Sequence, residues 1–323
     1  MKHFLTTLDW SRAELQEILD DARVLKTRPL GDDLAGKSVA LLFFNPSLRT
    51  RTSFELGVHQ LGGKAIVLEP GKGAWPISFD EGVMDQEPEE HVKEVARVLS
   101  RWVDVIAVRA FPKFESWDDD RTDKVVRAFA AYASVPVINM ETITHPCQEL
   151  ALMLTMQERF GGAVDGKRFL LTWTYHPKPL NTAVANSALI IAAKFGMQVT
   201  LLCPTPEYVL DERYMSAAPG VRVTHDIDDA YAGADFVYAK SWGALPYFGR
   251  WPAEKPIRDA HKHFIIDEAK MAKTPHALFS HCLPVRRNVK VTDEVLDSPC
   301  AVHIDEAENR LHVQKALLRR IVR

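Results

Sequence analysis

The chain lacks several features that would place it in a specialised class of protein. It has no stretch approaching the roughly 20 apolar residues that span a bilayer, and its acidic, amphipathic N-terminus does not resemble a signal peptide. Its four cysteines lie far apart without metal-site spacing, so we expect a reduced, cytoplasmic protein without disulfides or a bound metal. The net charge is only −3, which argues against a general partner such as nucleic acid or a membrane surface.

A glycine-rich nucleotide fingerprint is also missing. No G-x-G-x-x-G follows any apolar run of the sequence, which disfavours a Rossmann oxidoreductase. Any recognition of anions must therefore come from local side chains.

What the chain does have is an alternation of short apolar runs and helix-like segments. Continuous apolar strands separated by helices are typical of parallel sheets covered on both faces. Two such series, divided near residues 145–165, predict an α/β protein with two doubly wound parallel-sheet domains. We expect strands at 38–44, 65–68, 104–109, 135–139, 168–174, 198–203, 221–224, 235–239 and 277–281, and helices at 11–26, 51–61, 89–101, 121–133, 180–195 and from 308 onward. The Pro- and aromatic-rich segment 241–262 is predicted to be a long loop.

The stretch "FFNPSLRTR" (43–51) places two arginines and two hydroxyls directly after a predicted strand. Ligands of open α/β sheets bind at such strand ends, where a helix N-terminus offers unpaired N–H groups to an anion. Arg49 and Arg51 could add charge-assisted hydrogen bonds to a phosphate. Alternatively, the arginines are surface charges and Ser47 only caps the helix.

Two further segments carry polar groups at strand ends. His145 and Gln148 in "HPCQ" would point from the first turn of a helix, suited to gripping a carbonyl group, although a His-Pro pair is often a satisfied loop histidine. Arg109 ends another strand of the same half, so three strand ends could converge on one anion. In "FSHCLPVRRNVK" (279–290), Cys282 is either a reactive thiol or a small buried hydrophobe.

"SLRTR", "HPCQ" and "HCLP", in this order, resemble the aspartate/ornithine carbamoyltransferase family over essentially the whole chain. The resemblance implies a carbamoyl phosphate-binding domain at 1–145, an acceptor-binding domain at 146–305 that contains a chain knot, and a C-terminal helix at 306–323 that packs back on the first domain. It implies the catalytic residues His145, Gln148, Arg109 and Thr50. It implies carbamoyl phosphate binding by Ser47, Leu48, Arg49, Thr50, Trp75, Arg109, His145, Gln148, Cys282 and Arg310.

The acceptor differs from that of ordinary ornithine carbamoyltransferases. Their Asp-x-x-x-Ser-Met-Gly loop is replaced here by "KSWGALPYFG", in which Lys240 stands where an acid would meet an α-ammonium. A cationic lysine would repel that ammonium but could pair with an α-carboxylate, which fits an acylated α-nitrogen; otherwise it is a surface lysine. By resemblance to the acylornithine branch of the family, N-acetylornithine is bound by Glu141, His176, Asn181, Lys240 and Leu283.

The acyl group is set, by the same resemblance, at Glu89. A glutamate there would repel the second carboxylate of a succinyl group, whereas acetyl carries no charge. We therefore expect carbamoyl transfer from carbamoyl phosphate to the δ-amino group of N-acetylornithine, in arginine biosynthesis, with succinylornithine as the alternative acceptor. The resemblance further implies a homotrimer, to which Trp75 and Glu89 reach from a neighbouring subunit, and a candidate carboxylysine at Lys290. No cofactor is needed, because carbamoyl phosphate is already activated.

A rival hypothesis from another class is a non-catalytic, carbamoyltransferase-like protein that only binds anions. The three intact motifs argue against it.

Overall fold

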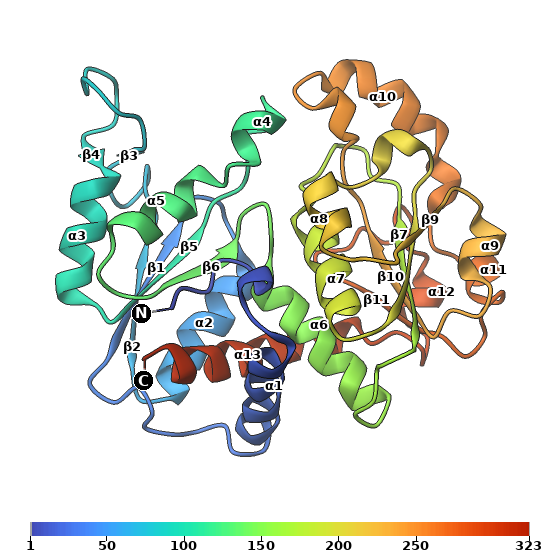
Figure 1. Ribbon diagram of the computed structural model, residues 1–323, viewed down its shortest axis with the longest axis horizontal. Coiled ribbons are helices and arrows are strands. Elements are labelled where there is room, and N and C mark those ends of the chain that lie inside the picture. Colours follow the sequence, from blue (N-terminus) through green and yellow to red (C-terminus); the bar gives the residue numbers. More distant parts are fainter. Residues whose placement is uncertain (1, 323) are drawn as a thin grey trace. The chain divides into compact units, whose positions relative to one another are not determined.

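The computed structural model describes residues 2–322 and contains two compact units (Figure 1). Unit 1 comprises the chain up to Pro112, Asp118–Cys147, and the part from Arg310 onward. Unit 2 comprises Lys113–Trp117 and Gln148–Asn309. The predicted domain limits of 1–145, 146–305 and 306–323 assign binding roles as well as boundaries, and those roles stay a prediction.

Unit 1 is built on a four-stranded parallel sheet of order β2-β1-β5-β6. Its strands are β1 (Ser38–Phe43), β2 (Lys64–Leu68), β5 (Val105–Arg109) and β6 (Val137–Glu141), and a short pair is formed by β3 (Ile77–Ser78) and β4 (Glu90–His91). The helices are α1 (Arg12–Thr27), α2 (Leu48–Gln60), α3 (Val92–Trp102), α4 (Trp117–Asp120) and α5 (Lys124–Tyr132).

The core of unit 1 follows from continuous apolar strands. β1 and β5 are buried almost throughout, and their side chains pack with apolar residues of α3 and α5 such as Ala96 and Phe129. Ser11 and Glu14 form the predicted capping box at the start of α1. These observations confirm the predicted parallel sheet covered by helices.

Unit 2 holds a five-stranded parallel sheet of order β11-β10-β7-β8-β9. Its strands are β7 (Arg168–Trp173), β8 (Gln198–Leu202), β9 (Arg222–Thr224), β10 (Phe236–Lys240) and β11 (Leu278–His281). The helices are α6 (Pro146–Arg159), α7 (Ala183–Lys194), α8 (Glu212–Ser216), α9 (Ile227–Tyr231), α10 (Trp251–Ala260), α11 (Glu268–Met271) and α12 (Asp293–Leu296). α13 (His303–Val322) begins in unit 2 and continues in unit 1. Short 3-10 turns occur at Thr7–Asp9, Pro206–Tyr208, Leu245–Tyr247 and Lys262–Phe264.

The predicted long loop at 241–262 is wrong in its second half. α10 occupies residues 251–260, with a proline near its N-terminus and Pro256 inside it. A proline in the first turn is compatible with a helix, because the N–H it removes has no intrahelical partner. Buried Glu254 and Arg258 pair one turn apart, which stabilises the helix despite Pro256. Proline therefore marked a helix start here rather than a loop.

α13 is the last helix and is mostly buried. In unit 1 it lies beside α2 (Figure 1), close enough that a Cβ added to Gly57 would meet the Lys315 side chain at 3.2 Å. The Nζ of buried Lys315 donates to Leu25 O at 3.1 Å, Pro29 O at 3.1 Å and Gln60 Oε1 at 2.9 Å. Burial lowers the pKa of this lysine.

Among residues 2–322, no helix has both the length and the apolar character required to cross a membrane. None of the four cysteines forms a disulfide within that range.

Candidate active site

The N-terminus of α2 forms the first part of the site, in unit 1. Ser47 is its N-cap, and the Ser47 Oγ accepts a hydrogen bond from Thr50 N at 3.1 Å. The helix therefore begins at Leu48, slightly earlier than predicted, with the "SLRTR" segment in its first turn. Leu48 is 74% exposed, whereas Thr50 is buried. Ser47 therefore caps the helix, as the alternative reading of this segment expected. Capping by Ser47 leaves other N–H groups of the first turn available to an anion.

Arg109 and Glu141 lie at the carboxyl ends of the adjacent strands β5 and β6. They are partners across the ladder at a register shift between Val108 and Arg109, and their side chains form an ion pair. The Nη2 of Arg109 also lies 3.5 Å from Pro46 O, next to the start of α2. His145 Nε2 lies 3.3 Å from Glu141 Oε2. Glu141, predicted to bind N-acetylornithine, therefore contacts both Arg109 and His145, which are predicted to bind carbamoyl phosphate.

Arg310 joins this group from α13. Its Nη2 donates to Thr50 Oγ1 at 2.9 Å, and its side chain is almost fully buried. Burial lowers the pKa of Arg310; Glu141 opposes that effect, and the positive charges of Arg109 and Arg49 add to it. We call Arg49, Arg109 and Arg310 the arginine cluster. Such a concentration of guanidinium groups at a helix N-terminus is suited to a multiply charged anion.

Arg51 does not belong to the arginine cluster. Its guanidinium lies 3.4 Å from Glu69 and 3.7 Å from Glu55, and its side chain is 43% exposed. It stabilises its own segment, and the spacing of "SLRTR" alone could not separate it from Arg49.

Trp75 and Glu89 occur on another part of unit 1. Trp75 is 66% exposed and Glu89 is exposed as well. Glu89 directly precedes β4 and Trp75 lies two residues before β3. Because these strands pair in register (Ile77 with Glu90), both residues lie next to the half-buried ribbon that β3 and β4 form. The structure does not bring them into contact with the arginine cluster within residues 2–322.

Unit 2 places Lys240 at the end of β10 and His176 just beyond β7, the neighbouring strand. His176 Nδ1 lies 2.8 Å from Lys178 O. Burial lowers the pKa of His176 to about 4, and the nearby charges of Lys290, Arg286 and Lys240 lower it further. His176 is therefore neutral at pH 7, within a basic group of side chains.

Lys290 is 2% exposed, and its Nζ lies 3.3 Å from His281 Nε2. His281 bonds through Nδ1 to the carbonyl of Cys282, so its Nε2 accepts from the lysine. Burial, together with the charge of Lys240, holds the pKa of Lys290 well below its ordinary value. Burial, together with the charges of Lys290 and Lys240, likewise lowers the pKa of His281. We call Lys240, Lys290, His176 and His281 the lysine-histidine cluster.

The other predicted residues of unit 2 have mixed surroundings. Asn181 precedes α7, and its Oδ1 accepts a hydrogen bond from Ala183 N at 3.1 Å. Cys282 is buried and is followed by Leu283. Gln148, in the first turn of α6, donates through Nε2 to Glu306 on α13. Glu306 was missed from the sequence, although it stands in a predicted helical region.

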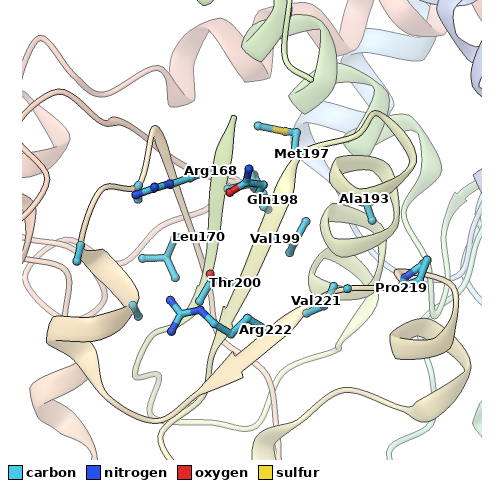
Figure 2. A pocket seen from close by; sticks show the side chains of 15 residues that line it. Arg168, Leu170, Ala193, Met197, Gln198, Val199, Thr200, Pro219, Val221 and Arg222 are labelled. Atoms are coloured by element: carbon cyan, nitrogen blue, oxygen red, sulfur yellow. The ribbon is translucent and has the colours of Figure 1, made fainter. Parts of the chain in front are cut away.

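A cavity of unit 2 lies elsewhere (Figure 2). It has a volume of about 490 Å³ and is lined by residues of β7, β8 and β9 together with their flanking segments, among them Arg168, Met197 and Arg222. None of its lining residues is a predicted site residue. It opens near the amino ends of β7 and β8, whereas the predicted residues follow the carboxyl ends.

Comparison with known proteins defines the class. Residues 2–158 match the aspartate/ornithine carbamoyltransferase carbamoyl-P binding domain, and residues 179–321 match the Asp/Orn binding domain of the same family. The chain belongs to the aspartate/ornithine carbamoyltransferase family. The family prediction, the two-sheet α/β fold and the enzyme class are thereby confirmed.

Particular relatives narrow this class. The N-acetylornithine carbamoyltransferase of Xanthomonas campestris pv. campestris is 65% identical, over 100% of this chain and 98% of the relative. The N-succinylornithine carbamoyltransferase of Bacteroides fragilis is 37% identical, over 88% of this chain and 87% of the relative. A crystal structure of acetylornithine transcarbamylase complexed with acetylcitrulline has a TM-score of 0.99 and 65% sequence identity, and covers 99% of each chain.

Proposed function

We propose that the chain transfers the carbamoyl group of carbamoyl phosphate to the δ-amino group of N2-acetyl-L-ornithine. The products are N2-acetyl-L-citrulline and phosphate, and the step belongs to arginine biosynthesis. Support comes from the relative named N-acetylornithine carbamoyltransferase and from the similar structure complexed with acetylcitrulline.

The observation that carries this proposal is the arginine cluster at the N-terminus of α2. Arg109 and Arg49 both affect the titration of Arg310, which in turn bonds Thr50. A phosphate offers enough acceptor oxygens for several guanidiniums and for the N–H groups of the helix end. Ser47, Leu48, Arg49, Thr50, Arg109 and Arg310 are the residues we assign to it.

The chemistry requires no group beyond these side chains and the two substrates. The δ-nitrogen attacks the carbonyl carbon of carbamoyl phosphate, and a tetrahedral oxyanion forms beside hydrogen-bond donors such as Arg109 and His145. The bond from that carbon to the phosphate oxygen then breaks, and the electron pair leaves with phosphate. The proton lost by the amine can pass to the departing phosphate.

The acceptor is assigned to the lysine-histidine cluster and to Glu141. A cationic Lys240 suits the α-carboxylate of an amino acid whose α-nitrogen is acylated and uncharged. The lowered pKa of His176 keeps its imidazole neutral near pH 7, so it can offer a hydrogen bond without repelling Lys240. Asn181 and Leu283 complete the proposed acceptor contacts. Trp75, His145, Gln148 and Cys282 are assigned to carbamoyl phosphate instead.

Selection of the acyl group is assigned to Glu89. A carboxylate facing the second carboxylate of a succinyl group costs several kcal/mol where solvation is poor. Its exposure is compatible with a site shared between subunits of a homotrimer, to which Trp75 and Glu89 would contribute from a neighbour.

Three further features remain proposals. A carboxylated Lys290 is supported by the lowered pKa of its amine, since a neutral amine is the form that reacts with CO2. A knotted second domain and a cytoplasmic location are supported by the family resemblance and by the dispersed cysteines, respectively. An intact-mass measurement under neutral conditions, with no added CO2 found, would count against the carboxylysine.

The decisive assay supplies the purified protein with carbamoyl phosphate and, separately, with acetylornithine, succinylornithine or ornithine. Citrulline-type product and phosphate should form fastest with acetylornithine. A preference for succinylornithine would mean that Glu89 does not control the acyl end. No product with any of the three would favour the non-catalytic anion binder.

A further inference from the structure

Glu306 is a carboxylate in the first turn of α13 and is only 1% exposed. Its Oε1 accepts from Gln148 Nε2 and, at 2.9 Å, from the hydroxyl of Tyr238. Its Oε2 accepts from Ser280 Oγ. Tyr238 and Ser280 are opposite each other on β10 and β11, and both are fully buried. All four residues belong to unit 2, so the network is internal to one compact unit.

The chemistry of the Gln148 contact fixes the orientation of its amide. Gln148 donates to Glu306 through Nε2, so the amide nitrogen faces the carboxyl group and Gln148 Oε1 turns to the opposite side. A flipped amide would set a carbonyl oxygen against a carboxylate oxygen in a buried setting, where such an electrostatic mismatch is strongly unfavourable.

We propose that Glu306 is a positioning residue for carbamoyl transfer, which acts by holding the amide of Gln148 in one of its two orientations. This inference rests on the proposed function, since Gln148 matters to catalysis only if it contacts the carbamoyl donor. The same carboxylate also ties Gln148 to β10, the strand that ends at Lys240. Glu306 thereby links the Gln148 amide, assigned to carbamoyl phosphate, to the strand that carries Lys240, assigned to the acceptor.

A purely structural role is the competing explanation, in which Glu306 only anchors α13 to the sheet. The two roles differ in which hydrogen-bond donor to Glu306 is important. Positioning acts through Gln148, whereas anchoring acts equally through Tyr238 and Ser280. Substitutions can separate them, because Ser280 donates to Oε2 of Glu306, whereas Gln148 donates to Oε1.

Two substitutions of Glu306 give the first test. Glu306→Gln retains an acceptor oxygen for Gln148 and Tyr238, while its new NH2 can face Ser280, whose hydroxyl can accept. Glu306→Met retains the length but removes every acceptor. We expect kcat/KM for carbamoyl phosphate to fall roughly 10- to 100-fold in Glu306→Met and by no more than about threefold in Glu306→Gln. Ser280→Ala, the matched control, should stay near the wild-type value.

A double-mutant cycle with Gln148→Ala gives the second test. If Glu306 acts through Gln148, Glu306→Met should cause no further loss of kcat/KM in the Gln148→Ala background. Multiplying losses would overturn the proposal, as would an equal loss in Ser280→Ala. If Glu306→Met lowers the thermal unfolding midpoint so far that it does not fold, Glu306→Asp, which shortens the reach but retains the charge, replaces it in the same cycle. A wild-type protein that transfers no carbamoyl group would instead refute the proposed function itself.

Discussion

The arginine cluster of unit 1 and the lysine-histidine cluster of unit 2 are both positive, but their charge has different chemistry. Guanidiniums remain protonated at any pH at which the protein is folded, so the arginine cluster presents a fixed charge. Lysines and histidines change charge when they are buried, and here burial and mutual repulsion hold His176, His281 and Lys290 towards their neutral forms. Binding of carbamoyl phosphate should therefore depend little on pH, whereas binding of the acceptor should carry the pH dependence.

The largest effect should come from removing a fixed charge. Arg49→Ala should lower kcat/KM for carbamoyl phosphate by about 10²- to 10³-fold, because a preorganised donor to the developing charge is lost. Steady-state kinetics and direct titration with carbamoyl phosphate measure this. Arg51→Ala is the matched control, since Arg51 pairs with Glu69 and Glu55 instead, and it should change kcat/KM little. Equal losses in the two variants would remove the distinction between them.

Removal of a charge from the other cluster should affect the other substrate. Lys240→Met should lower kcat/KM for acetylornithine by about 10- to 100-fold, the value of a charged hydrogen bond. The affinity for carbamoyl phosphate should be unchanged. The exposed Lys178 provides a control as Lys178→Ala. A loss of carbamoyl phosphate binding in Lys240→Met would break the assignment of one substrate to each cluster.

Substitution of the exposed Glu89, next to the β3-β4 ribbon of unit 1, should alter selectivity rather than rate. Glu89→Pro and Glu89→Ala should each shift the ratio of kcat/KM for succinylornithine over acetylornithine upward by about tenfold or more, because a like-charge repulsion is removed. Competition assays with both acceptors measure that ratio. Glu87→Ala removes an exposed carboxylate two residues away and should leave it unchanged; a matching shift there would point to a general effect of charge.

The smallest predicted effect is on stability. The pKa of His176 is about 4 in the folded protein, below the value near 6.5 of an unfolded chain, so the unfolded state binds more protons between these values. The stability from this group is complete above pH 6.5 and is lost as the pH falls towards 4. We expect His176→Gln to reduce the acid-induced fall in the free energy of unfolding by about 1 to 2 kcal/mol. Urea unfolding of both proteins at pH 7 and pH 5 measures the difference, and parallel curves would contradict the lowered pKa.

Much of the fold was predictable because its strands are continuous apolar runs. The nine strands of the two main sheets were located within a few residues, and the motifs "SLRTR", "HPCQ" and "HCLP" pointed to strand ends where the structure places Ser47, His145 and Cys282. α10 was missed because proline signals both a turn and a helix start, and only the buried pairing of Glu254 and Arg258 decides between them.

The partners of the site residues were less predictable than the residues themselves. Arg109 and Glu141 are far apart in the sequence, and their contact depends on a register shift between two strands. Glu306 has no local pattern that marks it, because its donors come from α6, β10 and β11. Such contacts arise only when distant segments assemble.

The buried Lys315 has a practical consequence for protein engineering. Its Nζ donates hydrogen bonds to three oxygens from the first sixty residues, so α13 is a packed part of the fold rather than a dispensable extension. Truncation within this helix, or replacement of Lys315 by an apolar residue, would leave those oxygens without this hydrogen-bond donor. It would also weaken the packing of α13 against the N-terminal part of the chain. Fusions and tags should therefore be attached beyond α13 and never in exchange for part of it.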